Sequence, residues 1–390
     1  MKYTNVIPLL HLGALALQTA AKDVTEQTKD SFEEKNGYSV TKHEKNINLQ
    51  ANENSIGLKQ NMVEANVQSR QKDESCSALD QARRLEVPKA KGTIDAEFEH
   101  ADFWDEHGDL IKLAWSELST SNSNETENAA ISNLQNIIHP SFYSAVEATH
   151  RNPTEANEEV IWSHMKEAGP PGKSQAYKTQ LLTDEGLRLL RSELDRATSS
   201  GILMRRPNAM NRYGCIIDRE VNGAVSLPTL TSLVKTVVSK IGRPLGRMLF
   251  ADAVGEGDDC EYFAFTIRYN AEEDLELKEH RDASVITLNI NLNLPEETYD
   301  GSSLYLVDDE KPLDFDVADD YEEERNKRYS ISFDPGMMLI HRGSTQHAAL
   351  PIKEGTRHNL VIWVFGAGGD VRIAPYEKED WLGVSERWGK

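Results

Sequence analysis

Hydrophobic and polar residues alternate most regularly between residues 285 and 292, in the sequence VITLNINL. The even positions are all aliphatic: Ile286, Leu288, Ile290 and Leu292. Thr287, Asn289 and Asn291 stand between them. Successive side chains of a strand point to opposite faces of the sheet. The pattern therefore predicts a strand with one face toward a hydrophobic shell and the other toward a polar pocket.

Other periodic stretches predict helices first and strands afterward. Apolar residues three and four apart predict one helix over residues 187–197, ending near Gly201, and a second over 230–241, opened by Pro228 and closed by Gly242. Further strands are expected at residues 263–269, 303–307, 337–341 and 359–365. This order indicates an α+β domain whose core is an all-β sandwich or barrel.

The first 21 residues resemble a targeting segment. An apolar run extends from Val6 to Leu17, and small residues follow at Ala20 and Ala21. The pattern is typical of a secretory signal peptide, and the run is too short to span a membrane. It predicts a protein of the endoplasmic reticulum lumen or a secreted protein. A transit peptide or an ordinary apolar stretch is the alternative, in which case the protein is soluble and intracellular.

Composition divides the remaining chain into three segments. Residues 22–94 are polar and of low complexity and have no sustained period, which indicates a disordered or loosely helical arm. Residues 95–172 are acidic but contain scattered aromatic residues, which indicates a partly helical region. A Gly-Pro-Pro-Gly break at 169–172 separates it from the expected ordered domain, residues 173–390, with its core at 260–366.

The net charge of −21 limits the possible partners. It argues against specific nucleic-acid binding, which needs clustered Lys and Arg, and it fits basic protein or peptide partners. The acidic segment Asp308–Glu324 either attracts such a partner to a functional site nearby or is a solvated loop. The three cysteines, Cys76, Cys215 and Cys260, form no metal-binding spacing. In an oxidising compartment Cys215 and Cys260 could form a disulfide, but the sequence does not require one.

Candidate chemistry lies just before the alternating strand. His280 and Asp282 are two residues apart, so a strand would point both in the same direction. His347 follows a later strand. Two histidines and one carboxylate form the face that binds non-haem Fe(II) and leaves coordination positions open. We expect His341 to pack beside this site and His358 to point to the opposite face.

Arg357 extends the hypothesis from a metal to a cosubstrate. It lies ten residues after His347, at the start of the strand 359–365. A guanidinium grips a carboxylate through two parallel hydrogen bonds. A keto acid that chelates iron at one end requires such a cation at its other end. Arg357 therefore favours an enzyme that uses a dicarboxylate over a cupin-like metal enzyme that does not.

These motifs together resemble a known family. The segments RYN (268–270), LKEHRDASVITLNINLN (277–293), YDGSSLYL (299–306), DPGMMLIHRG (334–343) and PIKEGTRHNLVIW (351–363) resemble 2-oxoglutarate- and Fe(II)-dependent dioxygenases of the prolyl/lysyl hydroxylase branch. Residues 268–293 are most similar to procollagen lysyl hydroxylases, and RPNAMNRYGCIIDRE (206–220) is similar to plant PKHD-type hydroxylases. The resemblance extends over residues 175–366.

The resemblance implies a double-stranded β-helix, or jelly roll, with supporting helices. It also implies oxidative decarboxylation of 2-oxoglutarate to succinate and CO2, coupled to hydroxylation of a substrate by O2, with ascorbate supporting the iron. His280, Asp282 and His347 would ligate Fe(II), and Arg357 would bind the distal carboxylate of 2-oxoglutarate. The substrate that the resemblance suggests is a lysyl or prolyl side chain of a protein.

The other implied pocket residues match the family less closely. Tyr269 would donate a hydrogen bond in the pocket, or it is a buried core tyrosine. Thr287 and Asn291 would line the cosubstrate site, although some relatives use a tyrosine at the position of Asn291. The usual Gly-Gly pair appears as Gly301-Ser302. A non-catalytic jelly roll that binds basic partners is the remaining alternative.

Overall fold

The computed structural model describes residues 77–87, 101–120, 136–169, 172–173, 176–208, 210–217, 221–254, 261–308, 328–366, 371–372 and 381–382. By its internal contacts the chain forms two units, 1–64 and 65–390, and every described residue belongs to the second. The expected signal peptide, Cys76, Cys260 and most of the acidic segment after Asp308 lie outside the described residues. Among those described, no helix is both long and apolar enough to cross a membrane.

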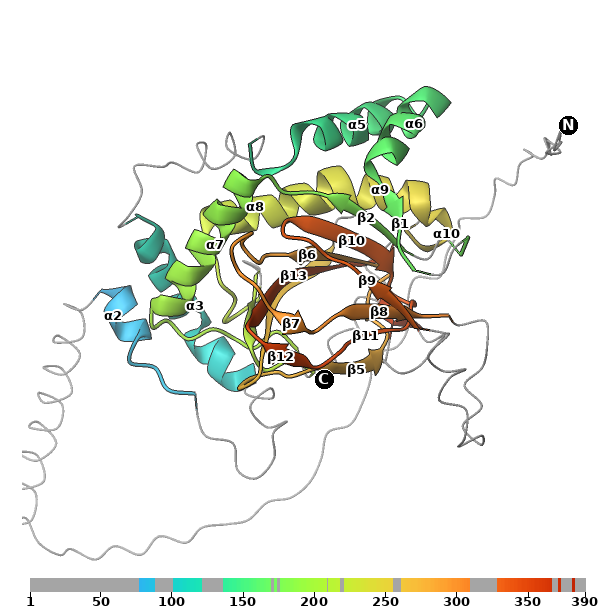
Figure 1. The fold of residues 1–390 in the computed structure, drawn as a ribbon. Coiled ribbons are helices and arrows are strands. Elements are labelled where there is room, and N and C mark those ends of the chain that lie inside the picture. Colours follow the sequence, from blue (N-terminus) through green and yellow to red (C-terminus); the bar gives the residue numbers. More distant parts are fainter. Residues whose placement is uncertain are drawn as a thin grey trace, which may run out of the picture. The chain divides into compact units, whose positions relative to one another are not determined.

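A seven-stranded antiparallel sheet forms the centre of the fold (Figure 1). Its strand order is β1-β2-β10-β6-β13-β4-β3. The strands are β1 (Lys166–Glu167), β2 (Ala176–Gln180), β3 (Gly214–Ile216), β4 (Tyr262–Asn270), β6 (Ile286–Asn291), β10 (Met337–Arg342) and β13 (Thr356–Val364). β6 and β13 therefore lie in the middle, where both of their edges are paired.

A second antiparallel sheet contains four strands in the order β5-β11-β8-β9. They are β5 (Leu277–His280), β8 (Leu304–Val307), β9 (Arg328–Ile331) and β11 (His347–Ala349). Two short pairs complete the β structure: β7 (Asp300–Gly301) with β12 (Ile352–Glu354), and β14 (Val371–Arg372) with β15 (Trp381–Leu382). Side chains of both larger sheets line one central cavity. The predicted α+β fold with a jelly-roll core is confirmed.

Helices cover the other face of the seven-stranded sheet (Figure 1). The helices on this side are α3 (Ala101–Thr120), α5 (Pro140–Arg151), α6 (Glu155–His164), α7 (Asp184–Ser199), α8 (Pro228–Thr236), the π-helical turn η2 (Val237–Gly242), α9 (Arg243–Leu249) and α10 (Ala251–Val254). Among them, α5 packs against η2 and α9 from the outer side (Figure 1). Leu288, Ile290 and Ile362 pack in the same cluster as Leu230 and Leu233 of α8. The predicted aliphatic face of residues 286–292 is thus the face that the helices bury.

The second predicted helix continues beyond its expected end. Gly242 has right-handed helical torsion angles, with φ −60°, and α9 follows directly. A Cβ at Gly242 would lie 2.8 Å from Leu288 Cδ1, and one at Gly246 would lie 2.7 Å from Ile286 Cδ1. These glycines therefore allow close packing of the helix on β6. The expectation that Gly242 ends the helix is wrong, because the residue serves packing and not termination.

Part of the segment expected to be disordered or loosely helical forms a packed helix. The short helix α2 (Ala78–Ala82) places Ala82 in the main core cluster. The carboxylate of Glu117 on α3 accepts hydrogen bonds from the backbone N–H groups of Ala78 and Leu79, at 3.0 and 2.9 Å. It satisfies donors that the first turn of a helix leaves free. Residues 77–87 are thus part of the packed structure.

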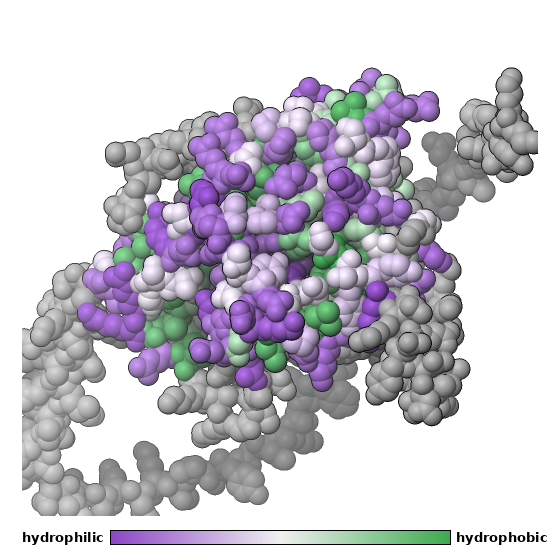
Figure 2. All heavy atoms as spheres, viewed as in Figure 1, coloured by the Kyte–Doolittle hydropathy of each residue, from purple (hydrophilic) through white to green (hydrophobic). Residues whose placement is uncertain are grey.

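The expected acidic region also packs with the later chain. Trp115 of α3 and Phe142 of α5 belong to the same core cluster as Leu187 of α7. The expected boundary near residue 172 falls between β1 and β2, which pair with each other. On the face seen in Figure 2, hydrophilic side chains predominate and hydrophobic ones occur in small groups.

Candidate metal and cosubstrate site

The three residues of the expected triad meet where the two sheets face each other. His280 ends β5 and His347 begins β11, and the two strands pair with these residues directly opposite. Asp282 follows in the segment that leads from β5 into β6. The expectation that His280 and Asp282 open the same strand as residues 286–291 is wrong. His280 ends β5 of the four-stranded sheet, and the chain then crosses to β6 of the seven-stranded sheet. That change of direction brings the carboxylate back beside the imidazole.

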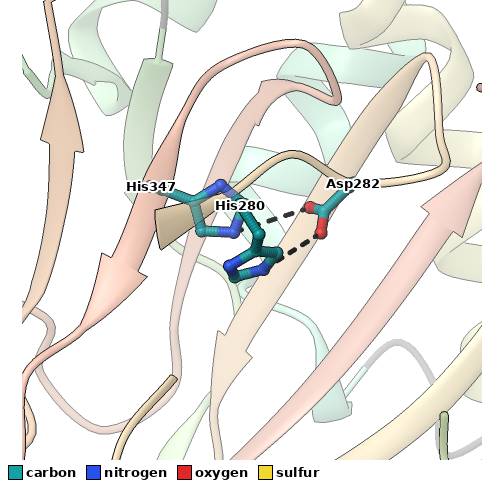
Figure 3. Close-up of side chains that lie close together, drawn as sticks. All are labelled: His280, Asp282 and His347. Carbon is teal, nitrogen blue, oxygen red and sulfur yellow. Dashed lines mark ion pairs between the residues drawn. The ribbon is translucent and has the colours of Figure 1, made fainter. Parts of the chain in front are cut away.

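Side-chain donor atoms of this triad converge (Figure 3). His280 Nε2 lies 3.6 Å from Asp282 Oδ1, and His347 Nε2 lies 3.8 Å from Asp282 Oδ2. The ligand atoms of the three residues all lie within 4.8 Å of one another. All three side chains are buried, with the residues 3–5% exposed. This is the only cluster of at least three His, Cys, Asp or Glu residues with such geometry among the described residues.

Backbone carbonyls orient both imidazoles. His280 Nδ1 lies 2.7 Å from the carbonyl oxygen of Lys278, and His347 Nδ1 lies 3.0 Å from that of Thr345. Because a carbonyl only accepts, each Nδ1 carries the proton and each Nε2 presents its lone pair to the centre. Burial lowers the pKa of His280 to about 4, and it also lowers the pKa of His347. Both rings are therefore neutral at physiological pH, as metal ligands must be.

Asp282 is fixed through hydrogen bonds of its own. Thr287 Oγ1 donates to Asp282 Oδ2 at 2.5 Å, and the Ser284 hydroxyl lies 2.8 Å from that of Thr287. The backbone N–H of Asp282 donates to the carbonyl of Gly343 at 2.9 Å. Burial opposes ionisation of Asp282, but the neighbouring histidines and Thr287 outweigh it and lower its pKa. The hydroxyl of Thr287, expected at the cosubstrate, thus supports the carboxylate.

Arg357 lies in the wall of the same cavity and is 1% exposed. Its guanidinium carbon lies 5.9 Å from the ring centroids of both Tyr269 and Phe333. Its Nη1 donates to the carbonyl of Ser302, while its Nε has no partner. No carboxylate of the described residues pairs with it. A buried cation with this surrounding is suited to an anionic ligand, because an unpaired charge is costly to bury.

Tyr269 and a loop before β3 close the cavity beside Arg357. Tyr269 is 1% exposed, and its hydroxyl accepts a hydrogen bond from Asn211 Nδ2 at 3.2 Å. Burial raises the pKa of Tyr269 to about 12, so the phenol stays protonated. Asn208, Met210 and Asn211 line the cavity as well. This loop falls within residues 206–220, for which only a resemblance was noted. No local signal in the sequence indicates its role, because Tyr269 lies 58 residues beyond Asn211.

Asn291 does not reach the cavity. Its Nδ2 donates to the carbonyl of Phe333 at 2.5 Å, and its Oδ1 accepts from the backbone N–H of Asn293 at 2.9 Å. Both ends of the amide are therefore used by the backbone, which contradicts the expected contact with a cosubstrate. Asn289, two residues earlier on β6, lines the cavity instead, and its side-chain oxygen accepts a hydrogen bond from Asn359 Nδ2 at 2.7 Å.

The two other histidines considered lie on different sides of the sheet. His341 is fully buried, and its Nε2 lies 3.8 Å from Asp282 Oδ2, but it is not part of the three-residue cluster. His358 contributes to a separate pocket that Arg191 also lines. Burial there lowers the pKa of His358 to about 4. His341 thus packs beside the carboxylate, as expected, and His358 is outside the site.

Comparison with known proteins adds a relationship in sequence. The chain is 28% identical over 239 residues to 2-oxoglutarate and iron-dependent oxygenase domain-containing protein 2 of Xenopus tropicalis, covering 61% of this chain and 60% of that protein. It is 26% identical over 158 residues to 2-oxoglutarate and iron-dependent oxygenase domain-containing protein ICU11 of Arabidopsis thaliana, covering 40% of this chain and 36% of that protein. The chain thus spans 60% or less of the length of these relatives.

The solved structures that match this chain do so with low TM-scores and low sequence identity. A prolyl-4-hydroxylase from Pseudomonas putida matches with a TM-score of 0.35 and 13% identity, over 58% of this chain and 98% of that one. The α-ketoglutarate-dependent carbocyclase SnoK gives a TM-score of 0.36 and 15% identity, over 54% and 90%. No family model matches the chain. By its sequence, the chain is a homologue of proteins named 2-oxoglutarate and iron-dependent oxygenase domain-containing proteins.

Proposed function

We propose that this protein is an Fe(II)- and 2-oxoglutarate-dependent dioxygenase. One observation carries the proposal: the buried cluster of His280, Asp282 and His347 opens on the same cavity as Arg357, a buried cation without a carboxylate partner among the described residues. A cupin-like metal enzyme would need the first feature and not the second. A non-catalytic jelly roll would need neither.

The donor set fits Fe(II). Two neutral imidazoles and one carboxylate bind a divalent transition metal and leave one side of an octahedron open. The Nδ1 contacts of His280 and His347 and the hydroxyl of Thr287 hold these ligands in place from outside. Iron held there would supply the redox chemistry that couples conversion of 2-oxoglutarate and O2 to succinate and CO2 with hydroxylation of a substrate.

The chain's own groups bind and orient the cosubstrate. Arg357, placed between the rings of Tyr269 and Phe333, would hold the distal carboxylate of 2-oxoglutarate. The Tyr269 hydroxyl lies in the same wall and is protonated at neutral pH. Phe265, Val361 and Trp363 form an apolar part of the cavity wall that limits the access of water.

Succinate release tests this function. We expect the parent protein to form succinate only with Fe(II) and 2-oxoglutarate present, and Arg357→Gln to raise KM for 2-oxoglutarate roughly 10- to 100-fold. Arg188→Gln is the matched control, because Arg188 is exposed and pairs with Glu296 on the surface. Equal kinetics for Arg357→Gln and the parent would contradict the assignment. Metal-dependent turnover that ignores 2-oxoglutarate would favour the cupin-like alternative.

The finer part of the proposal is a lysyl or prolyl side chain of a protein as substrate, with ascorbate keeping the iron reduced. It is supported by the resemblance of residues 268–293 to procollagen lysyl hydroxylases. The net charge of −21 favours a basic protein or peptide. Mass spectrometry of lysine- and proline-containing peptides tests it, with the gain of one oxygen atom as the expected result. We also propose a secretory location on the basis of residues 1–21, which N-terminal sequencing of the expressed protein would test.

A further inference from the structure

The loop that covers Tyr269 is held by a buried pair of asparagines. Asn208 and Asn211 are 8% and 2% exposed. Asn208 Oδ1 accepts hydrogen bonds from the backbone N–H groups of Met210 and Asn211, at 2.9 and 2.7 Å. A backbone N–H only donates, so these two bonds require the side-chain oxygen of Asn208 at this position.

The orientation of Asn208 determines that of Asn211. With its oxygen bound by the backbone, Asn208 presents its NH2 group to Asn211, whose Oδ1 lies 3.3 Å away. Asn211 therefore faces Asn208 with its oxygen and must face Tyr269 with its own NH2 group, at 3.2 Å. The order of donors and acceptors is thus fixed from the backbone to the phenol, although the two ends of an amide look alike by shape.

The phenol proton is left for a ligand. Tyr269 Oη accepts from Asn211, which has no acceptor at that end, and the neighbouring Arg357 guanidinium is also donor only. No other hydrogen-bond partner of the Tyr269 hydroxyl occurs among the described residues. The Tyr269 O–H can therefore donate only to an acceptor that enters the cavity, and a carboxylate next to Arg357 is such an acceptor.

We propose that Asn208 and Asn211 are positioning residues that fix the Tyr269 hydroxyl as a hydrogen-bond donor to the distal carboxylate of the cosubstrate. This inference rests on the proposed function. It gives the loop a role in selecting a 2-oxo acid with a second carboxylate over one without. Neither asparagine needs to touch the cosubstrate, because both act through Tyr269.

Asn208→Asp tests the direction of the chain. The new carboxylate still accepts the two backbone N–H bonds, so the turn is kept, but it has no N–H for Asn211. Asn211 then turns its NH2 group to the aspartate and its oxygen to Tyr269. That oxygen would accept a hydrogen bond from the Tyr269 hydroxyl. Asn211→Asp tests the same step one link later, because an aspartate there accepts that proton directly.

Affinity is measured by calorimetry with Mn(II) in place of Fe(II), for 2-oxoglutarate and for 2-oxopentanoate, which has a methyl group in place of the distal carboxylate. We expect each variant to weaken 2-oxoglutarate binding roughly tenfold or more and to leave 2-oxopentanoate binding unchanged. In a Tyr269→Phe background the same substitutions should change 2-oxoglutarate affinity less than about twofold. Asn136→Asp, a substitution of an exposed asparagine, controls for the added negative charge.

The outcomes separate the two proposals. Loss of affinity for both 2-oxo acids alike, or an equal loss in the Tyr269→Phe background, would overturn the positioning role while the proposed function stands. An unchanged affinity for 2-oxoglutarate in Asn208→Asp and Asn211→Asp would overturn it as well. Failure of the parent protein to bind 2-oxoglutarate with Mn(II) would overturn the proposed function itself. Equal unfolding midpoints for variants and parent show that the comparison concerns folded protein.

Discussion

The two faces of the seven-stranded sheet are made by the same strands and have opposite chemistry. On β6, Leu288 and Ile290 point to the helices and are fully buried among apolar side chains. Thr287 and Asn289, between them, point to the central cavity. The register extends this difference sideways: Ile340 and Ile362 flank Leu288, whereas His341 and Trp363 flank Thr287. One face stabilises the fold, and the other arranges chemical groups.

The cavity face also contains polar atoms that the protein does not satisfy. His341 Nε2, Arg357 Nε, Asn359 Oδ1 and Trp363 Nε1 are buried without a hydrogen-bond partner among the described residues. All four belong to β10 or β13. Native proteins leave few buried polar groups unpaired, and such groups call for a physical explanation. The difference between the faces teaches that stability and function can be separated by substitutions one residue apart.

The largest effect is expected on the cavity face from Asp282→Ala. It removes the carboxylate that the Nε2 atoms of His280 and His347 approach, and Fe(II) would lose its only charged ligand from the triad. Breaking a buried charge pair costs about 3–5 kcal/mol, so Fe(II) affinity should fall by roughly 100-fold or more. Metal titration of the folded variant measures this. An unchanged Fe(II) affinity would show that the cluster is not the metal site.

Leu288→Ala makes the corresponding change on the helix face. Leu288 is fully buried and contacts the position of Gly242, so truncation leaves a cavity. We expect the free energy of unfolding to fall by about 2–5 kcal/mol, measured by chemical denaturation. Fe(II) affinity of the folded protein should not change. A parallel loss of metal affinity would show that the two faces are not independent.

Part of the pH dependence of stability should come from the cavity face. His358, on the other side of the sheet, contributes in the same direction, because burial lowers its pKa to about 4 as well. The pKa of His280 is about 4 in the folded protein and 6.5 when unperturbed, with burial as the main cause. Above pH 6.5 neither state binds the proton; between 6.5 and 4 only the unfolded state does, so the metal-free protein loses stability as pH falls. The loss is about 1.4 kcal/mol per pH unit for this group.

Denaturation of metal-free protein at pH 7 and pH 5 measures this loss. Leu288→Ala should keep the pH dependence of the parent, because it removes no titratable group. His280→Asn should reduce that dependence. If the asparagine variant lost as much stability as the parent between these pH values, the pH dependence would have to arise elsewhere.

Thr287→Val should have the smallest effect. The substitution keeps the shape of the side chain and removes the hydroxyl that donates to Asp282. Loss of a group that orients a metal ligand weakens metal affinity about 10- to 100-fold, and we expect the lower end because the backbone of Gly343 still holds Asp282. Titration with Fe(II) measures it. A loss as large as that of Asp282→Ala would give Thr287 a more direct role.

Much of the sheet could be predicted from sequence because its chemistry repeats every second residue. The alternation at residues 285–292 placed both faces of β6 correctly. The triad and Arg357 were predicted because their residue types have few other uses in that order. What periodicity could not show was the change of sheet after His280, which depends on how the segment before β6 packs against Gly343.

The errors have related physical causes. Asn291 shares a face with Asn289, but the backbone around Phe333 uses its amide, which no pattern along β6 reveals. Gly242 looked like a helix end because glycine has two uses, termination and close packing, and only the neighbouring Leu288 distinguishes them. Asn208 and Asn211 were not assigned because their partner, Tyr269, lies 58 residues beyond Asn211. Long-range contacts decide each of these cases.

An anaerobic titration of the metal-free protein with Fe(II) and 2-oxoglutarate tests the central claim most directly. If His280, Asp282 and His347 hold the iron and leave positions open for a keto acid, a visible charge-transfer band should appear only when both are present. The band should be absent in His280→Ala. A parent protein that binds Fe(II) without developing the band, or a band of equal strength in His280→Ala, would contradict the account.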